Sequence, residues 1–498
     1  MLEREMKLGA GPGFHLPDLD GIGEGLRAQT LQPVRMDTHY FDTPDLRLVR
    51  WGFSLRHRRG EGWTLKMPST KVEGAEGALS REEITFVGPA KAPPKAAVDL
   101  VRAYVRRAPL AQIARLSTLR HKIKLFDSRG QLAAEVVDDE VTVLDGRRVA
   151  GRFRELEVEL GPVGDVELLT TLANRLRAHG AGAPDPTSKL VRALGPPALE
   201  GPEVTPGQVG PNPSIGEAVR LALAGSVHLL LVHDPLVRTG GHPEYVHQAR
   251  VATRRLRSDL RLFGSLLDPV WVGHLRDELS WIAGELGKVR DSEVLLERLQ
   301  NHSPALAVRD RSALGRLTAR IAAEGERGRV DLVAAMSSPR YLDLLDGLVE
   351  AARTPRFEPD ADAPAGQVLP RLALRAWRPL RKAAKALGPG SPDQDFHAVR
   401  ILAKRARYSA EACAPVVGRP ARELAKAAAA LQTVLGEHQD AVTAQAWIRT
   451  AGTTSRQGFV AGQLYAIEAA AARRSRAQVP AAWKALNRPA LREWMAAP

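Results

Sequence analysis

The stretch LEREMKLGA (residues 2–10) alternates charged and apolar side chains with the two-residue period of a β-strand. Glu3, Glu5 and Lys7 fall on one face of such a strand, and Met6 falls on the other. In an antiparallel sheet the apolar face packs on a core, while the charged face meets either solvent or a ligand. The stretch therefore predicts an antiparallel sheet with an ionic face.

The same alternation recurs through the first 195 residues, and each row of charges has one sign. Basic rows are expected at Arg56 and Arg58, at Lys66, and at Arg120, Lys122 and Lys124. An acidic row is expected at Glu155, Glu157 and Glu159. A solvated strand face normally mixes the two signs, and like charges two residues apart repel each other. We therefore expect a ligand of opposite charge beside each row.

The two kinds of row suit two kinds of ligand. Arginine and lysine side chains bind phosphate oxygens, and glutamates bind a hard cation such as Mg²⁺ or Mn²⁺. If the sheet closes into a barrel, the side chains of both kinds of row point into one channel. A metal and a polyphosphate held side by side are typical of phosphoryl transfer. The sequence contains no Gly-x-x-x-x-Gly-Lys loop, so a P-loop enzyme is not supported.

Composition limits the class of protein. The chain has 498 residues, 71 Lys+Arg against 57 Asp+Glu, and one cysteine, Cys413. One cysteine excludes a disulfide scaffold and a thiolate zinc cluster, and the net charge of +14 favours polyanionic partners. The N-terminus is charged, and no apolar run reaches the length of about 18 residues that a membrane span needs. We expect a cytoplasmic protein without membrane insertion.

The chain divides at a Pro/Gly-rich stretch, residues 196–211, which predicts a linker. Residues 1–195 carry the two-residue period of strands, and residues 212–485 carry the 3.6-residue period of helices. A second Pro-rich stretch divides the helical part into about 212–350 and 368–485. The expected fold is an α+β multidomain chain.

The helical part contains an internal repeat. HQARVATRRLRSDLRLF begins at His247 and HAVRILAKRARYSAEAC at His397, an offset of 150 residues. LGKVRDSEV begins at Leu286 and LGEHQDAVT at Leu435, an offset of 149. Two motifs that repeat at nearly one offset predict a duplicated helical bundle.

Each repeat carries a stripe of cations on one helix face. The first stripe is His247, Arg250, Arg254, Arg257 and Arg261, and the second is His397, Arg400, Lys404 and Arg407, with Arg255 and Arg405 at the edges. Their spacing of three or four residues places each set on one face. Cations without acidic neighbours one turn away lose helix-pair stabilisation. An external anion best explains both stripes.

The motifs of the first part resemble, in order, those of the CYTH family, the triphosphate tunnel metalloenzymes. EREMK (residues 3–7) has the Glu-x-Glu-x-Lys signature. The supporting motifs are YFDTPDLRL (40–48), LRHR (55–58), TLK (64–66), SREE (80–83), the Arg120/Lys122 pair, EVVDDEV (135–141), RELEVEL (154–160) and SKL (188–190). The resemblance implies an eight-stranded antiparallel tunnel that binds a triphosphate and hydrolyses it with Mg²⁺ or Mn²⁺.

The resemblance also implies roles for individual residues. The phosphate-binding residues would be Lys7, Arg56, Arg58, Lys66, Arg120, Lys122 and Lys189. The metal ligands would be Glu3, Glu5, Glu157, Glu159 and Asp138, with Asp138 a better candidate than Asp139, and the catalytic set would be Glu3, Glu5 and Lys7. Glu83 is expected to face the channel. The pair Glu155/Glu157 stays an alternative to Glu157/Glu159, and Thr85 stands where the family often has a second acid.

The helical part resembles the CHAD family, helical domains associated with inorganic polyphosphate. The resemblance rests on HxxRxxxRRLR (247–257), HxxRxxxKRAR (397–407) and LGxxxD at 286–291 and 435–440. It implies two antiparallel bundles related by a pseudo-twofold axis, with both stripes facing a shared basic channel. Polyphosphate would be bound by the two stripes and their edge residues, and Asp291 and Asp440 would tether arginines.

Three functions are compatible with these patterns. The first is metal-dependent hydrolysis of a triphosphate, with inorganic triphosphate favoured, combined with polyphosphate binding by the helices. The alternative is a non-catalytic polyphosphate-binding protein associated with polyphosphate granules. A specific nucleic-acid binder is disfavoured, because aromatic residues make up 5% of the chain and do not interleave with the cations.

Overall fold

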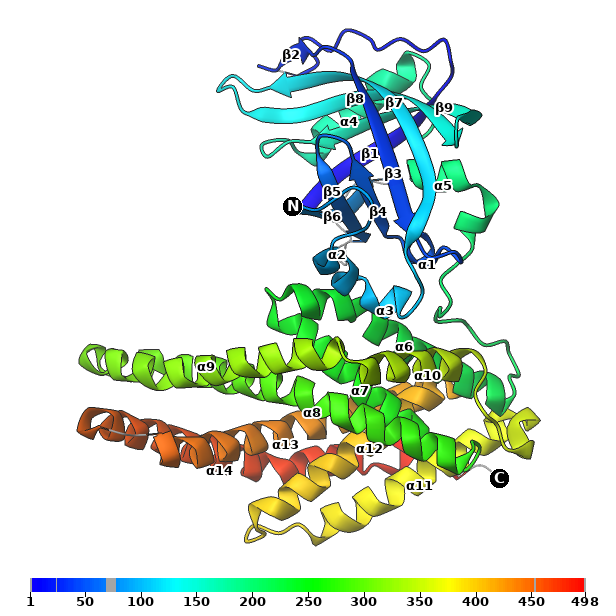
Figure 1. The fold of residues 1–498 in the computed structure, drawn as a ribbon. Coiled ribbons are helices and arrows are strands. Elements are labelled where there is room, and N and C mark those ends of the chain that lie inside the picture. Colours follow the sequence, from blue (N-terminus) through cyan, green and yellow to red (C-terminus); the bar gives the residue numbers. More distant parts are fainter. Residues whose placement is uncertain (1, 24, 69–77, 452–453, 497–498) are drawn as a thin grey trace. The chain divides into compact units, whose positions relative to one another are not determined.

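The computed structural model describes residues 2–23, 25–68, 78–451 and 454–496; the side chains of residues 2–3 and 78–81 lie outside the described part. The chain divides into two compact units, Met1–Glu203 and Val204–Pro498 (Figure 1). The division falls inside the Pro/Gly-rich stretch 196–211. Ala198 is buried and Glu203 pairs with Arg106, so the beginning of this stretch packs on the first unit.

The described part of the first unit contains a sheet of nine strands. They are β1 (Leu2–Ala10), β2 (Arg27–Thr30), β3 (Val34–Asp42), β4 (Ser54–Arg58), β5 (Gly62–Pro68), β6 (Ala78–Phe86), β7 (Ala111–Phe126), β8 (Leu132–Asp145) and β9 (Arg148–Leu160). The order β7-β3-β4-β5-β6-β1-β9-β8 closes on itself, because β8 also pairs with β7. β2 extends the ring where β7 runs past β3. The expected eight-stranded antiparallel barrel is confirmed.

Strand register decides which charges share the interior. Lys7 lies opposite Glu157, and Glu5 lies opposite Glu159, across β1 and β9. Arg120 lies opposite Asp139 across β7 and β8. Since register partners point to the same face of a sheet, the charged rows of neighbouring strands meet inside one channel.

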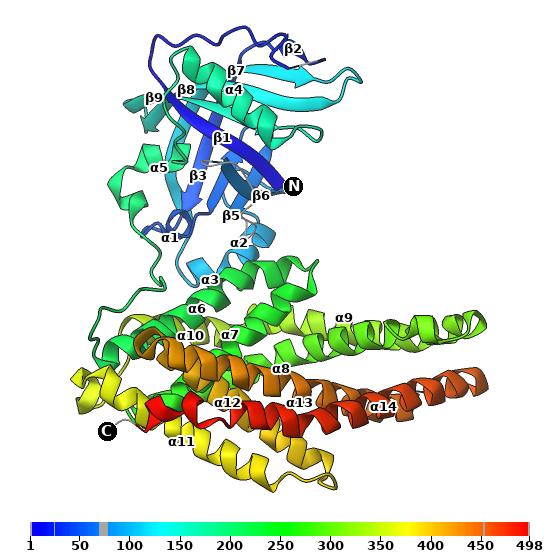
Figure 2. The same cartoon turned by 180° about the vertical axis from the view of Figure 1, so that it is seen from behind.

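The outer apolar face of the barrel is covered by a helix. α4 (Val166–Ala178) packs against β1 and β9 (Figure 2), and its Leu172 joins Met6, Leu8 and Val158 in one buried cluster. Burying an apolar side chain of this size stabilises a fold by about 1.5–3 kcal/mol. The Met6 face of β1 thus meets a helix, which leaves the Glu5 face turned inward. The remaining helices of the unit are α1 (Arg47–Arg50), α2 (Lys95–Leu100), α3 (Arg102–Val105), α5 (Lys189–Leu194) and the 3₁₀ helix η1 (Pro196–Leu199).

The second unit is helical. Its long helices are α6 (Ile215–Thr239), α7 (Pro243–Leu262), α8 (Pro269–Gln300), α9 (Arg311–Met336), α10 (Pro339–Arg353), α11 (Ala365–Ala386), α12 (Asp393–Val417), α13 (Arg419–Ala451) and α14 (Ser455–Leu486). Short 3₁₀ helices are η2 (Ser303–Ala305), η3 (Val308–Asp310), η4 (Pro359–Asp362), η5 (Pro489–Leu491) and η6 (Glu493–Met495). α8 packs along α9, and α13 packs along α14 (Figure 1).

The helix order repeats, as the sequence predicts. α6, α7 and α8 begin 150 residues before α11, α12 and α13. The two copies meet symmetrically at their first helices: Ile215 N donates to Ala363 O at 2.8 Å, and Ala365 N donates to Pro213 O at 3.0 Å. A shift of 150 residues relates the two donors, Ile215 and Ala365, and likewise the two acceptors, Pro213 and Ala363. Each copy thus gives one bond to the other and receives one, as a pseudo-twofold axis between the copies requires.

α6 is the helix within the described residues that is long and apolar enough to cross a membrane by length and composition. A buried core helix of a globular domain meets the same test, and 56% of the most apolar window of α6 is buried inside the protein.

Candidate functional site

Seven basic side chains line one cavity inside the barrel, with a volume of about 280 Å³. They are Lys7, Arg56, Arg58, Lys66, Arg120, Lys122 and Lys189, the set for which the sequence predicts phosphate binding. The carboxylates of Glu61, Glu83, Glu157 and Glu159 lie in the same lining. The cavity therefore combines both kinds of ionic row.

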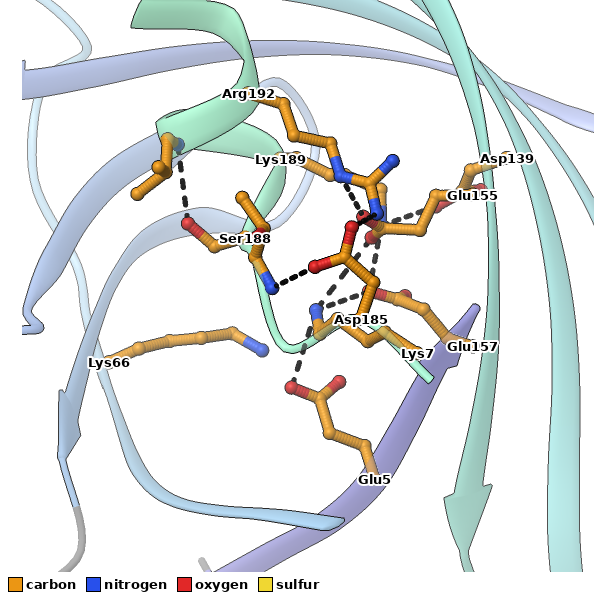
Figure 3. Close-up of polar contacts among 12 residues, drawn as sticks. Glu5, Lys7, Lys66, Asp139, Glu155, Glu157, Asp185, Ser188, Lys189 and Arg192 are labelled. Carbon is orange, nitrogen blue, oxygen red and sulfur yellow. Dashed lines mark hydrogen bonds and ion pairs between the residues drawn. The ribbon is translucent and has the colours of Figure 1, made fainter. Parts of the chain in front are cut away.

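Lys189 is placed by the start of a short helix. Ser188 caps α5 by accepting a hydrogen bond from Val191 N at 3.3 Å, and Leu190 is buried in an apolar cluster beside the barrel. These contacts fix the first turn, so that Lys189 Nζ reaches Glu155 and Glu157 at 2.7 Å each (Figure 3). Lys189 is consequently a fixed part of the interior.

Lys7 enters the same network from β1. Its Nζ lies 2.6 Å from Glu157 and 3.3 Å from Glu5 (Figure 3). Burial lowers the pKa of Lys7, but Glu157 and Glu5 outweigh burial and leave that pKa above its usual value. Burial likewise opposes ionisation of Glu157, yet Lys189, Lys7 and Arg120 hold its pKa well below the usual range. Both groups are therefore charged at neutral pH.

The acidic row on β9 divides into two parts. Glu157 and Glu159 line the cavity. Glu155 is fully buried behind them, with Lys189 and Arg192 as partners (Figure 3). Burial raises the pKa of Glu155. Of the two pairs left open by the sequence, Glu157/Glu159 is the one that faces the cavity.

The assignment of Asp138 as a cavity residue requires correction. Its carboxylate accepts hydrogen bonds from Arg154 Nε at 2.8 Å and Nη2 at 2.7 Å, on the opposite face of β8 from the cavity. Asp139 faces inward, accepts from Arg120 at 2.8 and 2.6 Å, and lies 3.0 Å from Lys189. Adjacent residues on a strand point to opposite faces, so one of the two aspartates has to face outward.

The carboxylates fit a divalent cation. Glu5 and Glu159 are register partners, which places their Cβ atoms about 4.5–5.5 Å apart. Glu5 Oε1 is buried and receives no hydrogen bond, although Lys7 Nζ lies 3.3 Å from it. Among the described side chains no three His, Cys, Asp or Glu residues already converge on a metal position, and the Glu3 side chain lies outside that set. Mg²⁺ is commonly held by one or two carboxylates together with substrate phosphates, and this donor set suits such binding.

Several features of the tunnel were not assigned from sequence, including the cavity carboxylate Glu61. Tyr40 and Ser54 line the cavity, and Tyr40 is the register partner of Arg56, so pairing β3 with β4 could have located it. Asp42 has a structural role, because its carboxylate accepts hydrogen bonds from Thr43 N, Leu48 N and Val49 N and thereby holds α1. Glu83 pairs with Lys66 in the channel, as expected.

The helical unit contains a second charged cavity, of about 430 Å³. Six of the predicted polyphosphate-binding residues line it: His247, Arg250, Arg254, His397, Arg400 and Lys404. α8 and α13 complete it with Arg290, Arg298, Asp291, Gln439 and Asp440. Arg290 and Arg298 were not assigned from sequence; their eight-residue spacing places both on one face of α8.

The LGxxxD motifs shape this cavity. Arg250 Nη1 donates to Asp291 at 2.7 Å and to Gly287 O at 3.2 Å, so Asp291 tethers an arginine as predicted. A Cβ on Gly287 would lie 3.4 Å from the Arg250 guanidinium, and a Cβ on Gly436 would lie 3.7 Å from that of Arg400. In both repeats an arginine thus lies against the glycine of the neighbouring helix.

Cations outnumber anions around Lys404. Burial lowers its pKa, and Arg400, Arg254 and Arg250 lower it further, to about 7. Burial and the same first-repeat arginines also lower the pKa of Arg400, whose buried Nε has no hydrogen-bond partner. A bound anion would relieve both.

The stripes do not stay together along their whole length, contrary to expectation. Arg255 and Arg407 pair with Glu411 at 3.0 and 2.7 Å, so Arg407 does have an acidic neighbour one turn away. Arg261 and Arg405 line a different pocket, and the pKa of Arg257 is lowered by burial and by Arg276 on α8. The reason is that α7 and α12 contact each other where Arg254 meets Tyr408, which ends the cavity at that point.

The histidines that begin the two stripes differ in their contacts. His397 Nδ1 lies 2.7 Å from Gln439 Oε1. Burial lowers the pKa of His247, and Arg290 adds to that effect. A neutral imidazole can still donate one hydrogen bond to a phosphate oxygen.

The two units together define a class: a closed ionic tunnel in the same chain as a duplicated helical bundle with a cationic cavity. The CYTH domain model matches residues 1–192, and the CHAD domain model matches residues 221–449. Two uncharacterized proteins of Mycobacterium tuberculosis, one from each of two strains, are 33% identical over 523 residues, covering 98% of this chain and 96% of theirs. The chain belongs to the family in which a CYTH domain is followed by a CHAD domain.

Two solved structures are similar to parts of the chain. PptA from Streptomyces chartreusis is 24% identical and covers 55% of this chain and 100% of its own, with a TM-score of 0.47. The CHAD domain from the plant Ricinus communis is 26% identical and covers 59% of this chain and 96% of its own, with a TM-score of 0.42.

Proposed function

We propose that the tunnel hydrolyses a triphosphate with the help of Mg²⁺ or Mn²⁺, and that inorganic triphosphate is the substrate. The observation that carries this proposal is the convergence of seven bases and four carboxylates on one cavity of about 280 Å³. The lining is dominated by charged side chains, which match phosphate groups better than a nucleoside or a thiazole ring.

The residues of the chain bind and orient the substrate. The Lys and Arg side chains neutralise the phosphate oxygens, and the guanidinium groups of Arg56, Arg58 and Arg120 can form paired hydrogen bonds to them. Glu5, Glu157 and Glu159, with Glu3, would hold the divalent cation, which supplies charge neutralisation and an activated water when bound. Lys189 and Lys7 keep Glu157 ionised. Water attacks the terminal phosphorus directly, so no nucleophilic side chain is needed.

The helical unit is proposed to bind inorganic polyphosphate in its 430 Å³ cavity. Lys404 and Arg400 support this, because their pKa values are lowered by burial and by neighbouring cations. We further propose a cytoplasmic location with association to polyphosphate granules. The alternative, a polyphosphate-binding protein without turnover, is favoured by one observation: the cavity carboxylate Glu157 is already engaged by Lys7, Lys189 and Arg120.

Phosphate release separates these proposals. The purified chain is assayed with tripolyphosphate, ATP and thiamine triphosphate, each with and without Mg²⁺ or Mn²⁺. Metal-dependent release that is fastest from tripolyphosphate is expected. Glu5→Gln should abolish it while the circular dichroism spectrum stays unchanged.

Glu140→Gln is the matched control, because Glu140 is half exposed beside Arg154 outside the cavity. Full activity in Glu5→Gln would contradict the metal assignment. Absence of turnover in the wild type, with polyphosphate binding retained, would favour the alternative.

A further inference from the structure

The duplication places two equivalent pockets in the helical unit. One pocket, of about 270 Å³, lies between α7, α11 and α12, and is called the α11 pocket here. The other, of about 560 Å³, lies between α6, α7, α12 and α13, and is called the α6 pocket. A shift of 150 residues relates Arg375, Arg405, Ser409 and Arg261 of the α11 pocket to Gly225, Arg255, Asp259 and Glu411 of the α6 pocket.

The α6 pocket contains two acids, Asp259 and Glu411, beside its basic side chains. Glu411 pairs with Arg255 at 3.0 Å and with Arg407 at 2.7 Å. The buried carboxyl of Asp259 accepts a hydrogen bond from Ser226 Oγ at 3.2 Å. Burial raises the pKa of Asp259 to about 8. The acids of this pocket thus have partners within the protein, although Arg255 Nε, like Arg405 Nε in the α11 pocket, is buried without a hydrogen-bond partner.

The α11 pocket lacks both acids at the equivalent positions. The position of Glu411 holds Arg261, and the position of Asp259 holds Ser409, while Arg375 replaces a glycine. No carboxylate appears in its lining among the described residues. Arg261, Arg375 and Arg405 have no ion pair or side-chain hydrogen bond within the described part of the chain. Three guanidinium groups therefore share a pocket without a counter-charge.

Two buried donors in the α11 pocket are unsatisfied. Arg405 Nε and Ser409 Oγ are both buried and lack a hydrogen-bond partner, and Ser409 is 4% exposed. Leaving such a group unpaired costs about 1–3 kcal/mol. Burial lowers the pKa of Arg261, and Arg405 lowers it further. A bound anion or ordered water is one source of the missing partners.

We propose that the α11 pocket is a separate binding site for a compact phosphoryl anion, held by Arg261, Arg375, Arg405 and the hydroxyl of Ser409. Planar guanidinium groups bind phosphate oxygens in pairs. One wall of the pocket is apolar, formed by Leu262, Leu372, Ala376, Pro379 and Leu402. The wall can take the organic part of a phosphomonoester, while pyrophosphate would use the arginines alone. The site is distinct from the 430 Å³ cavity, with which it shares no lining residue.

Pyrophosphate binding to the full chain tests the site by isothermal titration calorimetry. Arg261→Gln with Arg375→Gln should lower the stoichiometry by one pyrophosphate per chain. Arg371→Gln with Arg378→Gln, on the same helix but outside the pocket, makes the same change in net charge and should bind as the wild type does. Arg250→Gln with Arg400→Gln, in the 430 Å³ cavity, should still bind pyrophosphate in the α11 pocket. Unchanged stoichiometry in the pocket variant would overturn the proposal.

A second variant keeps the test decisive if the double variant folds poorly. Arg261→Glu gives the α11 pocket the glutamate that the α6 pocket has at the equivalent position, Glu411. The new carboxylate should pair with Arg405 as Glu411 pairs with Arg255. It should abolish pyrophosphate binding at this site and raise the unfolding temperature of the free protein. Retained binding would refute the proposal. Phenyl phosphate and inorganic phosphate then distinguish the sources: tighter phenyl phosphate binding, lost in Arg261→Glu, assigns an organic phosphate, and equal binding assigns an inorganic one.

Discussion

The tunnel and the helical cavity hold their lysines in opposite electrostatic surroundings. In the tunnel, carboxylates outweigh burial and raise the pKa values of Lys7 and Lys189. In the helical cavity, burial and three arginines lower the pKa of Lys404 to about 7. The tunnel is therefore neutralised internally before any ligand arrives, which suits a site that positions metal and substrate together. The helical cavity keeps an excess of cations, which the proposed anion would neutralise.

Removing Lys189 should have the largest effect, because it tests the internal neutralisation of the tunnel. Lys189→Met leaves Glu155, Glu157 and Asp139 short of a counter-charge. Breaking a buried ion pair from one side costs about 3–5 kcal/mol of unfolding free energy. Loss of a charge-assisted donor to the substrate should lower kcat by about 10²–10³-fold.

Urea unfolding and tripolyphosphate hydrolysis measure the two effects of Lys189→Met. Lys95→Met is the control, because the Lys95 side chain is 82% exposed. Wild-type stability in Lys189→Met would mean that the carboxylates of the tunnel do not depend on this lysine.

The helical cavity should respond in affinity more than in stability. Arg250→Gln with Arg400→Gln removes one cation from each repeat, and each charge-assisted hydrogen bond contributes about 1.5–3 kcal/mol. Affinity for long-chain polyphosphate should fall by about a hundredfold or more. The unfolding free energy should change little, since the cations repel one another in the free protein. Fluorescence anisotropy with labelled polyphosphate measures the affinity. The double variant Arg371→Gln with Arg378→Gln is the control. If it binds polyphosphate as weakly as the cavity variant does, the binding site is not localised in the cavity.

The two neighbouring aspartates of β8 give a smaller and more selective test. Asp139→Asn weakens the paired contact that holds Arg120, and should lower turnover by about tenfold, corresponding to about 1.4 kcal/mol. Asp138→Asn affects the Arg154 pair outside the cavity, and should leave turnover within about twofold. Steady-state kinetics on both variants decides the question. The reverse order would show that Asp138 has the role first expected for it.

This aspartate pair illustrates what the sequence can and cannot predict. In EVVDDEV, Val136 and Val137 are both apolar and Asp138 and Asp139 are both acidic. The alternation therefore does not show which of the two aspartates faces the interior of the barrel. The pairing of β8 with β7 and β9 decides which aspartate faces the interior, and this pairing involves residues outside the motif. In EREMKL, Met6 and Leu8 alternate with Glu5 and Lys7, and the inward face of Glu5 and Lys7 follows directly even though Arg4 shares the face of Met6.

The cationic stripes show the corresponding limit for helices. Spacing correctly places His247, Arg250 and Arg254 on one face of α7. Where that face ends depends on the crossing of α7 with α12 at Tyr408, and helix crossings are not encoded in the period of either helix alone. Arg257 and Arg261 therefore share the spacing of the stripe but not its cavity.

The last test concerns Lys404 and pH. An unfolded lysine has a pKa of about 10.4, whereas in the folded protein the pKa of Lys404 is about 7. Between these values the unfolded chain binds more protons than the folded one, so the contribution of Lys404 to stability rises with pH across this window. Lys404→Met should flatten that rise in urea unfolding between pH 7 and 10.

In the free protein the surroundings of Lys404 favour its neutral amine. Bound polyphosphate should favour the ammonium form instead, because the anion stabilises a positive charge. Binding at pH 8 should therefore take up nearly one proton, and affinity should fall by about tenfold or more between about pH 7 and pH 9 in the wild type but not in Lys404→Met. Calorimetry in buffers of different ionisation enthalpy measures the proton uptake. Equal uptake in both proteins would assign the proton to another group, and the contrast between the two lysine environments would then have no consequence for binding.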